Sequence, residues 1–304
     1  MKKYLFIINP TAGNVDVEQL VPQIKKIAEI YPAEIKIVIT EYHRHAIELA
    51  QEAEENSFVI SVGGDGTLNE IVNGIDTDKN ITLGLLPTGS GNDFKNNINI
   101  STSIIENINY YFSDKVKTQK IDVGSLTYKL EGDPTIYNHT RFVNSLGVGF
   151  DAYAAHLNQS SKILSGLPSY IIAVLRALFK YESINVTLNF EDKTIIGDKL
   201  LLAIGNGKTT GGGFYLTKDA LVDDGLLDIC VVDFITRRKL LSKIPAAIKK
   251  RLDTVPEVTN LKLKTAKINL QKPYYVHADG EIISDKVTEL EISIEKNKLN
   301  IITF

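Results

Sequence analysis

A glycine-rich turn between a predicted strand and a predicted helix is the feature that most constrains this chain. Residues 58–62 are apolar and largely β-branched, which predicts a short buried strand. Three glycines between positions 63 and 66 then turn the chain, and residues 67–73 carry apolar side chains at helical spacing before Gly74. Because glycine lets the backbone approach an anion closely and a helix N-terminus offers unpaired N–H groups, this arrangement is typical of phosphate binding.

The turn does not match the two best-known phosphate-binding fingerprints. Position 69 is Asn, which excludes G-x-G-x-x-G, and no Lys follows the glycines, which excludes the Walker A pattern. The turn carries a carboxylate instead, that of Asp65. A carboxylate beside phosphates is repulsive unless a cation such as Mg²⁺ lies between them. Taken alone, the turn is equally compatible with a plain strand–helix connection and a solvated Asp65.

The composition places the chain among ordinary globular proteins. A length of 304 residues suits one large or two medium domains, and a net charge of −3 argues against general nucleic-acid binding. No stretch reaches 18 consecutive apolar residues and no signal peptide is evident, so we expect a cytoplasmic protein without a transmembrane segment. The single cysteine, Cys230, lies in an apolar run and is expected to be a buried thiol in a reducing compartment.

The first hundred residues alternate between strand-like and helix-like segments. The predicted strands cover residues 4–8, 35–39, 58–62 and 81–86, and the predicted helices cover residues 17–30, 46–53 and 67–73. Such alternation predicts an α/β domain with a parallel sheet and helices on both faces. Ligands of such sheets bind at the carboxyl ends of the strands. We therefore expect the polar turns that follow three of the strands to converge; they cover residues 9–13, 63–67 and 87–93.

From about residue 121 the pattern changes to successive strands, which predicts a largely antiparallel second domain. The predicted strands are residues 121–127, 141–146, 184–190, 194–205, 226–232, 261–270, 274–278, 287–294 and 299–304. Two helical inserts are expected within this domain, at residues 151–182 and 235–252.

Three turns, in this order, resemble the catalytic domain of diacylglycerol kinases and related lipid kinases, including sphingosine kinases. They are Asn-Pro-Thr-Ala-Gly, Gly-Gly-Asp-Gly-Thr-Leu-Asn-Glu and Pro-Thr-Gly-Ser-Gly-Asn-Asp, at residues 9–13, 63–70 and 87–93. The second half is similar to compact bacterial members at residues 122–124, 144–151, 211–213, 223–228 and 279–281. The resemblance implies a nucleotide-binding α/β domain, a mainly antiparallel β-sandwich domain, and an active site in the cleft between them. The implied boundaries are residues 1–125 plus a returning strand at 295–304, and residues 126–294.

The resemblance also implies ATP and Mg²⁺ as cofactors. Phosphoryl transfer needs positioning, cations that neutralise charge, and a group that takes the hydroxyl proton. Without a P-loop lysine, backbone N–H groups and metal must hold the phosphates. One of the implied residues, Ser90, stands where relatives usually carry Thr and keeps the hydroxyl. The implied nucleotide-binding residues are Asn9, Pro10, Thr11, Ala12, Gly13, Thr40, Gly63, Gly64, Asp65, Gly66, Thr67, Leu68, Asn69, Glu70, Thr88, Gly89, Ser90, Asn92 and Asp93.

Two carboxylates near the end of the chain are candidates for proton transfer. If this segment is extended, Asp279 and Glu281 point to the same face, and Gly280 leaves room for a substrate. By resemblance, Glu281 is expected to accept the proton and Asp279 to bridge to Mg²⁺ or to the acceptor hydroxyl, although these roles could be exchanged. The alternative interpretation is a hairpin turn with two solvated acids.

Other acidic residues have roles implied by the resemblance. A carboxylate network is expected from Asp65, Asp93 and Asp122, although Asp93 could equally cap a helix or turn. In bacterial members, the residue that matches Asp224 binds a structural Mg²⁺ with backbone carbonyls, which here are those of Leu221 and Leu226. The alternative for Asp224 is an ordinary Asp-Asp-Gly turn.

Two segments give information about the molecule that accepts the phosphate. The apolar residues 170–179 could line a lipid pocket or form a plain core helix. Residues 236–252 include seven basic and no acidic side chains, and could approach anionic head groups or form a solvated helix face. We therefore expect an ATP- and Mg²⁺-dependent kinase that phosphorylates a hydroxyl of diacylglycerol or a similar lipid at a membrane surface, with peripheral membrane association. Relatives dimerise, but nothing in the sequence decides whether this chain does.

Two rival functions are compatible with parts of the sequence. An NAD or sugar kinase also uses a Gly-Gly-Asp-Gly loop, but the Asp-Gly-Glu sequence and the apolar segment favour a lipid. A non-catalytic lipid- or nucleotide-binding regulator would be marked by loss of Asp65, Asp279 or Glu281, all of which are present. Among the scattered histidines, His277 is expected to pack near the site rather than to act in catalysis.

Overall fold

The protein is represented by a computed structural model that describes residues 1–13, 16–159, 166–180 and 182–304. The chain divides into two compact units. One comprises Met1–Asp122 together with Asn297–Phe304, and the other comprises Val123–Lys296. No helix among the described residues is long and apolar enough to cross a membrane.

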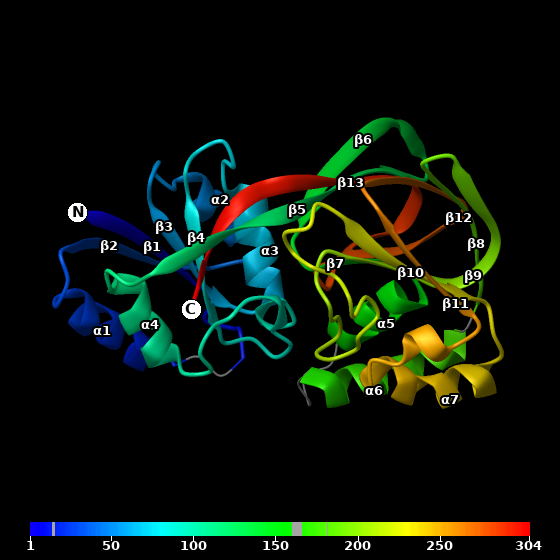
Figure 1. Ribbon diagram of the computed structural model, residues 1–304, viewed down its shortest axis with the longest axis horizontal. Helices are drawn as coiled ribbons and strands as arrows, with labels where there is room; N and C mark the ends of the chain where they lie inside the picture. The colour runs from blue at the N-terminus through cyan, green and yellow to red at the C-terminus, as the bar shows by residue number, and fades with distance from the viewer. Residues whose placement is uncertain (14–15, 160–165, 181) are drawn as a thin grey trace. The chain divides into compact units, whose positions relative to one another are not determined.

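The first unit contains parallel strands with helices packed against them (Figure 1). Its elements are β1 (Lys2–Ile8), α1 (Val17–Ala28), β2 (Ala33–Ile39), α2 (His45–Gln51), β3 (Phe58–Gly63), α3 (Asp65–Gly74), β4 (Thr82–Pro87), the short 3₁₀ helix η1 (Phe94–Asn97), α4 (Ile104–Phe112) and the end of β13 (Glu281–Thr303). The strand order is β13–β4–β3–β1–β2, and each neighbouring pair is parallel. The carboxyl ends of β1, β3 and β4 therefore lie next to one another.

Helix caps explain where the helices of this unit begin. Asp16 caps α1 by accepting a hydrogen bond from Gln19 N (3.1 Å). Helix α3 begins at Asp65, two residues before its predicted start, because Gly64 is extended and serves as the N-cap. The other predicted helices and strands of this unit agree with the structure to within one or two residues. The unpaired N–H groups of α3 consequently belong to the glycine turn itself.

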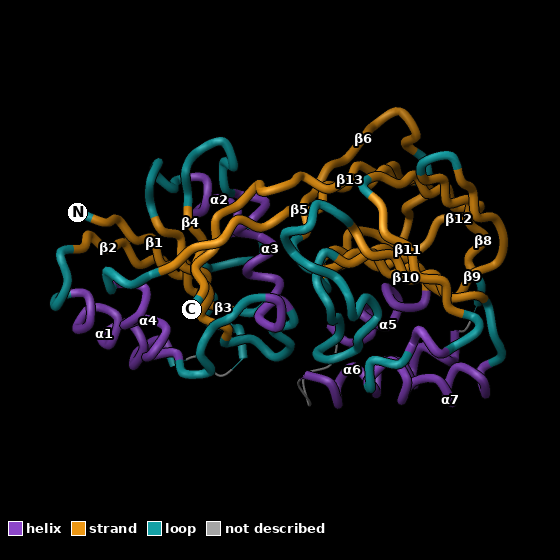
Figure 2. The backbone as a smooth tube through the Cα atoms, viewed as in Figure 1, coloured by secondary structure: helices purple, strands orange, loops and turns teal. Residues whose placement is uncertain are grey.

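The second unit consists mainly of antiparallel strands, together with the helices drawn in purple in Figure 2. Its strands are β5 (Lys117–Leu130), which begins in the first unit, β6 (Asp133–Phe142), β7 (Ser145–Gly149), β8 (Ile184–Phe190), β9 (Lys193–Gly205), β10 (Leu227–Asp233), β11 (Val258–Leu263), β12 (Thr265–Ala278) and most of β13. Its helices are α5 (Phe150–Gln159), α6 (Gly166–Ala177), α7 (Arg237–Ile248) and the short 3₁₀ helices η2 (Leu178–Lys180) and η3 (Leu252–Thr254).

Side chains on the two faces of β9 and β10 belong to different cores. One core is formed largely by strands and includes Leu202, Ile229 and Ile268. The other includes Leu201 and Val232 and is covered by α5, α6 and α7. Cys230 lies in this second core with no exposed surface, and burial raises the pKa of its thiol to about 12. The prediction of a buried structural thiol is therefore confirmed.

Several predicted boundaries in this unit are wrong. The predicted strand 261–270 is two strands, because the chain turns at Lys264 between β11 and β12. The predicted strands 287–294 and 299–304 are parts of one strand, β13, which continues through the polar residues between them. The predicted helix 151–182 is α5, α6 and η2; residues 160–165 and 181 are not among the described residues, and Glu182 is not helical.

Candidate functional site

Three turns in the first unit meet at the carboxyl ends of their strands, as predicted. Asn9 N donates a hydrogen bond to the carbonyl oxygen of Val62 (2.9 Å), which links the turn after β1 to β3. The backbone N–H groups of Thr88 and Gly89 both donate to the carbonyl oxygen of Gly63 (2.9 and 3.2 Å), which links the turn after β4 to the glycine turn. The three turns are therefore held together by main-chain bonds.

Glycine is required where these turns touch. Gly13 has a φ of +63°, and a Cβ atom there would collide with the carbonyl oxygen of Thr88. A Cβ atom on Gly89 would collide with the backbone of Gly64. Side chains are thus excluded from these two contacts, and the main chain there is open to the close approach of an anion.

The carboxylate of Asp65 positions the turn that follows β4. It lies in the first turn of α3 and accepts hydrogen bonds from the N–H groups of Asp93 (2.9 Å) and Phe94 (3.0 Å), where η1 begins. Asp65 and Asp93 are therefore brought together through the backbone N–H of Asp93. A contact of Asp65 with a phosphate-bound metal stays a prediction.

Buried oxygen atoms without a partner mark where a ligand could bind these turns. The Thr88 hydroxyl and the Asn92 side-chain carbonyl are buried and have no hydrogen-bond partner within the described part of the chain. Asn92 is held in a left-handed conformation (φ +52°), and its amide donates to the carbonyl oxygen of Gly89 (2.5 Å). Buried polar atoms normally have partners, so these atoms fit a polar ligand, such as the nucleotide that the sequence predicts.

Hydrogen bonds within the unit occupy two other predicted nucleotide-binding residues. Asn9 donates to the hydroxyl of Thr67 (3.1 Å), and both lie at the meeting point of the turns. Glu70 points elsewhere, because its carboxylate accepts from the N–H groups of Arg44 (3.0 Å) and Ala46 (3.2 Å) at the start of α2. Glu70 therefore caps a helix, which the sequence pattern could not reveal.

The remaining predicted residues of this unit lie in three environments. Pro10, Thr11 and Ser90 are exposed in the turns, whereas Ala12 and Gly66 are partly buried there. Leu68 and Asn69 are buried within α3, and Thr40 is buried just after β2. Asp122 is fully buried and accepts a hydrogen bond from Asn297 N (2.7 Å), so it ties β5 to the final part of β13; its part in a carboxylate network stays a prediction.

In the second unit, Asp279 and Gly280 form the two-residue loop of a β-hairpin. Both have positive φ angles (+50° and +86°), and Ala278 pairs with Glu281 across β12 and β13. Asp-Gly is a typical sequence for such a loop, because both positions need left-handed backbone. The expected extended geometry, with Asp279 and Glu281 on one face, is therefore wrong.

Asp279 is buried and anchors this hairpin. Its Oδ2 atom accepts from Val143 N (2.9 Å), and its Oδ1 atom accepts from Asn144 N (2.8 Å) and Ser145 N (2.9 Å), at the bend between β6 and β7. The alternative interpretation was right about the turn and wrong about a solvated Asp279. Glu281 is only partly buried, and its carboxylate accepts a hydrogen bond from the side chain of Gln159 (3.1 Å).

A buried network behind the hairpin includes residues to which the sequence assigned no role. His277 has no exposed surface; its Nε2 atom lies 3.0 Å from Asp151 Oδ2, and its Nδ1 atom accepts from Gly280 N (3.2 Å). Because Nδ1 accepts, the hydrogen of the neutral ring belongs on Nε2 and points to Asp151. Tyr170 also donates to Asp151 Oδ1 (2.5 Å). His277 therefore packs beside the candidate site, as expected.

Burial and hydrogen bonds have opposite effects on Asp151. Burial by itself raises the pKa of this carboxyl, but the hydrogen bonds from His277 and Tyr170 outweigh it, and the pKa is lowered. Asp151 belongs to the segment 144–151 that resembles bacterial lipid kinases, and that segment was the only available signal of its importance.

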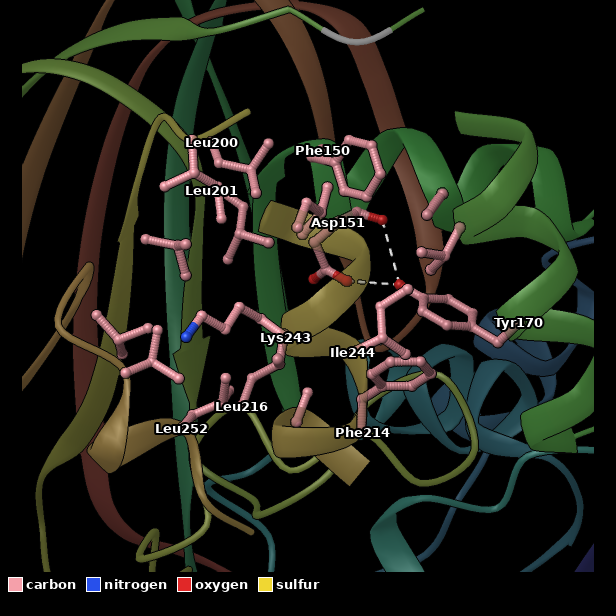
Figure 3. A pocket seen from close by; sticks show the side chains of 18 residues that line it. Phe150, Asp151, Tyr170, Leu200, Leu201, Phe214, Leu216, Lys243, Ile244 and Leu252 are labelled. Atoms are coloured by element: carbon pink, nitrogen blue, oxygen red, sulfur yellow. Dashed lines mark hydrogen bonds between the residues drawn. The ribbon is translucent and has the colours of Figure 1, made fainter. Parts of the chain in front are cut away.

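An apolar cavity of about 70 Å³ adjoins this network (Figure 3). Asp151 and Tyr170 are among its lining residues, and Lys243 of α7 is the only cationic lining residue in the described chain. Most other lining residues are aliphatic or aromatic, including Leu200, Leu201 and Phe214. The apolar segment 170–179 therefore lines a pocket with some residues and packs in the core with others.

The residues predicted to hold a structural Mg²⁺ are arranged around a lysine. Lys262 Nζ lies 3.3 Å from Asp224 Oδ2 and 3.2 Å from Asp228 Oδ2. Asp224 Oδ1 accepts a hydrogen bond from the N–H of Leu226 (3.0 Å). The side chain of Leu221 is half exposed. The described residues contain no cluster of three acidic, histidine or cysteine side chains suited to a metal. These contacts do not fit a resident divalent ion, because an ammonium group already neutralises the carboxylates.

The pKa shifts of this cluster agree with an ion pair. Burial lowers the pKa of Lys262, but Asp228 and Asp224 outweigh it and raise the pKa. Burial raises the pKa of Asp228, and the hydrogen bond and charge of Lys262 counteract that effect only in part.

We expect removal of Lys262, but not removal of metal, to destabilise the second unit. Treating the unaltered protein with EDTA should leave its melting temperature unchanged. Lys262→Met should lower the free energy of unfolding by about 1–2 kcal/mol, because one of the two carboxylates is buried. Added Mg²⁺ should restore part of that loss in the variant. Thermal melts with EDTA or Mg²⁺ measure all three effects.

A matched lysine provides the control. Lys267 pairs with Glu291, which is half exposed, and with Glu289, which also pairs with Lys129, so Lys267→Met should change stability less. A melting temperature of the unaltered protein that falls with EDTA, together with one bound Mg²⁺ per chain, would instead establish the metal site predicted at Asp224.

Two family models match the chain. The model described as the diacylglycerol kinase catalytic domain matches residues 3–126, and the model described as the YegS C-terminal NAD kinase beta sandwich-like domain matches residues 144–303. The first match contains the three turns, and the second contains the Asp-Gly-Glu hairpin and the cavity.

Individual relatives agree with these matches. A diacylglycerol kinase of Staphylococcus epidermidis is 27% identical over 285 residues, which cover 92% of this chain and 86% of the relative. A diacylglycerol kinase of Staphylococcus carnosus is 25% identical, with 92% and 89% covered.

Solved structures share the fold. A crystal structure of a diacylglycerol kinase from Bacillus anthracis has a TM-score of 0.72 at 22% identity and covers all of this chain and 97% of its own. Yeast NADH kinase, solved with NADH, has a TM-score of 0.54 at 12% identity, with 99% and 83% covered.

Proposed function

We propose that this chain, which belongs to the family of diacylglycerol kinases and YegS-like lipid kinases, transfers the γ-phosphate of ATP to a hydroxyl group of diacylglycerol or a related lipid. One observation carries the choice of a lipid. The hairpin with Asp279 and Glu281 is bonded through His277 to Asp151, which lines an apolar cavity. An almost wholly apolar cavity suits the alkyl part of a lipid, whereas the polar groups of a water-soluble acceptor would lose hydrogen bonds there.

In the first unit, the three turns would bind the phosphates of ATP. The N-terminus of α3 offers N–H groups and a partial positive charge, and the glycines allow the phosphates to approach them. Among the residues that the structure describes, the buried Thr88 hydroxyl and Asn92 side-chain carbonyl at this place have no hydrogen-bond partner. Mg²⁺ bound with the nucleotide would neutralise phosphate charge. Asp65 would maintain the shape of this surface through its bonds to the turn after β4.

We expect Asp65→Asn to raise the KM for ATP about tenfold with a smaller effect on kcat, because an amide has one acceptor oxygen where the carboxylate has two. One of the bonds to Asp93 N and Phe94 N would be lost and the turn would loosen. Steady-state kinetics with varied ATP measures the change. Asp76→Asn, in an exposed turn of the same unit, is the control. An unchanged KM would show that Asp65 does not organise the nucleotide site.

In the second unit, Glu281 would take the proton of the acceptor hydroxyl. Asp279 is the weaker candidate, because both of its carboxylate oxygens already accept backbone hydrogen bonds. Glu281 follows directly in the chain, is partly exposed, and begins a strand whose position Asp279 fixes. Asp279 would therefore position the hairpin, and Glu281 would perform the proton transfer.

The cavity would receive part of an acyl chain. Its walls come from β9, β10, α5, α6 and α7, and almost all of its lining is apolar. Burial of methylene groups there would contribute to binding at about 0.8 kcal/mol for each. The cavity does not distinguish diacylglycerol from phosphatidylglycerol or a sphingoid base, since each presents a hydroxyl beside alkyl chain.

The test is transfer of labelled γ-phosphate from ATP with Mg²⁺ to lipids in mixed micelles. Diacylglycerol, phosphatidylglycerol and sphingosine would be offered separately, with NAD and a hexose as water-soluble acceptors. A labelled lipid that is absent with Glu281→Gln would support the proposal and identify the acceptor. Label on NAD or hexose alone would replace it with the soluble-substrate kinase to which the fold is also similar. ATP binding without any transfer would favour a regulatory protein.

A further inference from the structure

We propose that the outer faces of α6, η2 and α7 form a surface that docks on an anionic lipid bilayer. This proposal rests on the proposed function only in that a lipid kinase must reach its substrate in a membrane. The surface, called here the α6–α7 face, consists of the apolar residues Ile172, Leu175, Phe179 and Leu241 and the basic residues Arg176, Arg238 and Lys249.

The apolar part of this face is a row of exposed side chains along α6 and η2. Ile172, Leu175 and Phe179 are spaced by three and four residues, so they lie on one side of the helix. They are 43%, 44% and 88% exposed. The opposite side of α6 is buried in the core and includes Tyr170 and Val174. Scattered exposed apolar residues are normal, but a row along one helix marks an interaction surface.

The basic part lies on α7 and just beyond its end. Residues 236–252 carry seven basic side chains and no acidic one. Among them, Lys239 pairs with Glu257 and Lys250 lies over the ring of Tyr215. Arg238 and Lys249 are exposed and, among the described residues, take part in no ion pair. The acidic residues close to this segment are paired, as Asp233 is with Lys199 and Asp253 is with Lys218.

Both helices cover the same face of the strands and line the same cavity (Figures 1 and 3). Tyr170 and Val174 of α6, and Leu240, Lys243 and Ile244 of α7, are among the lining residues. The two helices that present apolar and basic groups outward are thus the ones that enclose the cavity. A bilayer in contact with the α6–α7 face would lie directly over the space proposed for an acyl chain.

A bilayer fits this face because apolar and basic groups are combined there. Helices that lie in the plane of a membrane interface combine an apolar side with Lys or Arg near the head groups. Each basic residue close to an anionic surface strengthens membrane binding about fivefold. The net charge of the chain is −3, so the attraction would come from this local cluster and not from the protein as a whole.

The test is sedimentation of the full chain with vesicles of phosphatidylcholine alone or with about 30% phosphatidylglycerol, without ATP. We expect binding to the anionic vesicles that weakens as salt is added. Leu175→Ser with Phe179→Ser should weaken binding about tenfold. Separately, Arg238→Glu with Lys249→Glu should weaken it at least about 25-fold, because two basic residues are lost at about fivefold each. The controls are Ile196→Ser, which replaces an apolar residue that is 69% exposed on β9, and Lys193→Glu with Lys272→Glu. These should bind like the unaltered protein.

A second readout separates this proposal from the proposed function. Each variant would also be assayed with a short-chain diacylglycerol that dissolves as monomers. Variants that lose vesicle binding and keep this activity would support docking by the α6–α7 face. Anionic vesicles that bind all variants equally, or do not bind the unaltered protein, would overturn the docking proposal even if the soluble lipid is phosphorylated. Selective loss of vesicle binding without phosphorylation of any lipid would support docking and refute the kinase assignment.

Discussion

Glu281→Gln is expected to lower the turnover number for lipid phosphorylation at least about 100-fold, the usual scale for loss of a general base. Glutamine has nearly the same shape as glutamate and preserves an oxygen for the bond from Gln159, but it cannot accept the hydroxyl proton. The loss should appear in kcat at saturating ATP and lipid, while the KM for ATP changes little. Initial rates with labelled ATP and the accepted lipid measure it.

A second glutamate on the same strand provides the control. Glu291 lies on β13, is exposed, and pairs with Lys267, so Glu291→Gln should retain nearly full activity. Both variants should have the melting temperature of the unaltered protein. If Glu281→Gln keeps at least half of the activity, another group takes the proton and the role assigned to Glu281 is wrong.

Asp279→Ala is expected to reduce the free energy of unfolding by about 4 kcal/mol. The side chain accepts three backbone hydrogen bonds, and alanine would leave Val143, Asn144 and Ser145 without their acceptor in a buried place. Alanine also tolerates the φ angle of +50° poorly. Urea denaturation followed by circular dichroism measures the change, and activity should fall because the hairpin with Glu281 is no longer fixed.

Two further variants separate the anchor from the backbone strain. Asp279→Gly removes the hydrogen bonds but suits the positive φ, so it should be more stable than Asp279→Ala by about 1 kcal/mol. Glu191→Ala changes an exposed residue with a similar φ of +48° in another hairpin. Glu and Ala both carry a Cβ, so the backbone strain is the same before and after, and the free energy of unfolding should change little. If Asp279→Ala and Glu191→Ala reduce the free energy of unfolding by the same amount, the three hydrogen bonds of Asp279 contribute nothing to stability.

The sequence predicted the features that arise from neighbouring residues. The apolar run before Gly63 and the helical spacing after it identified β3 and α3, and the order of strands and polar turns indicated that the turns would meet. The burial of Cys230 followed from the apolar run around it. These features depend on local periodicity and on glycine, which leave a direct trace in the order of residues.

The features that the sequence did not reveal depend on the sign of a backbone φ angle or on distant partners. For Asp279 the sequence left both an extended segment and a hairpin turn open, and only the pairing of β12 with β13 decides between them. Glu70 caps a helix 24 residues earlier in the chain, and Lys262 reaches Asp224 from a strand 38 residues later. No spacing rule predicts such pairs, because they form only when the strands are in register.

The path of β13 has a consequence for how the protein is made. The strand runs from the Glu281 hairpin to Thr303, and its last part pairs with β4 through Asn300 and Ile301. During translation, β4 leaves the ribosome long before those residues. The β4 edge of the first sheet is therefore unpaired while the second unit is synthesised. Only when Ile301 and Ile302 emerge can that edge be covered and their side chains enter the core. The unit that is translated first is therefore the last to be completed.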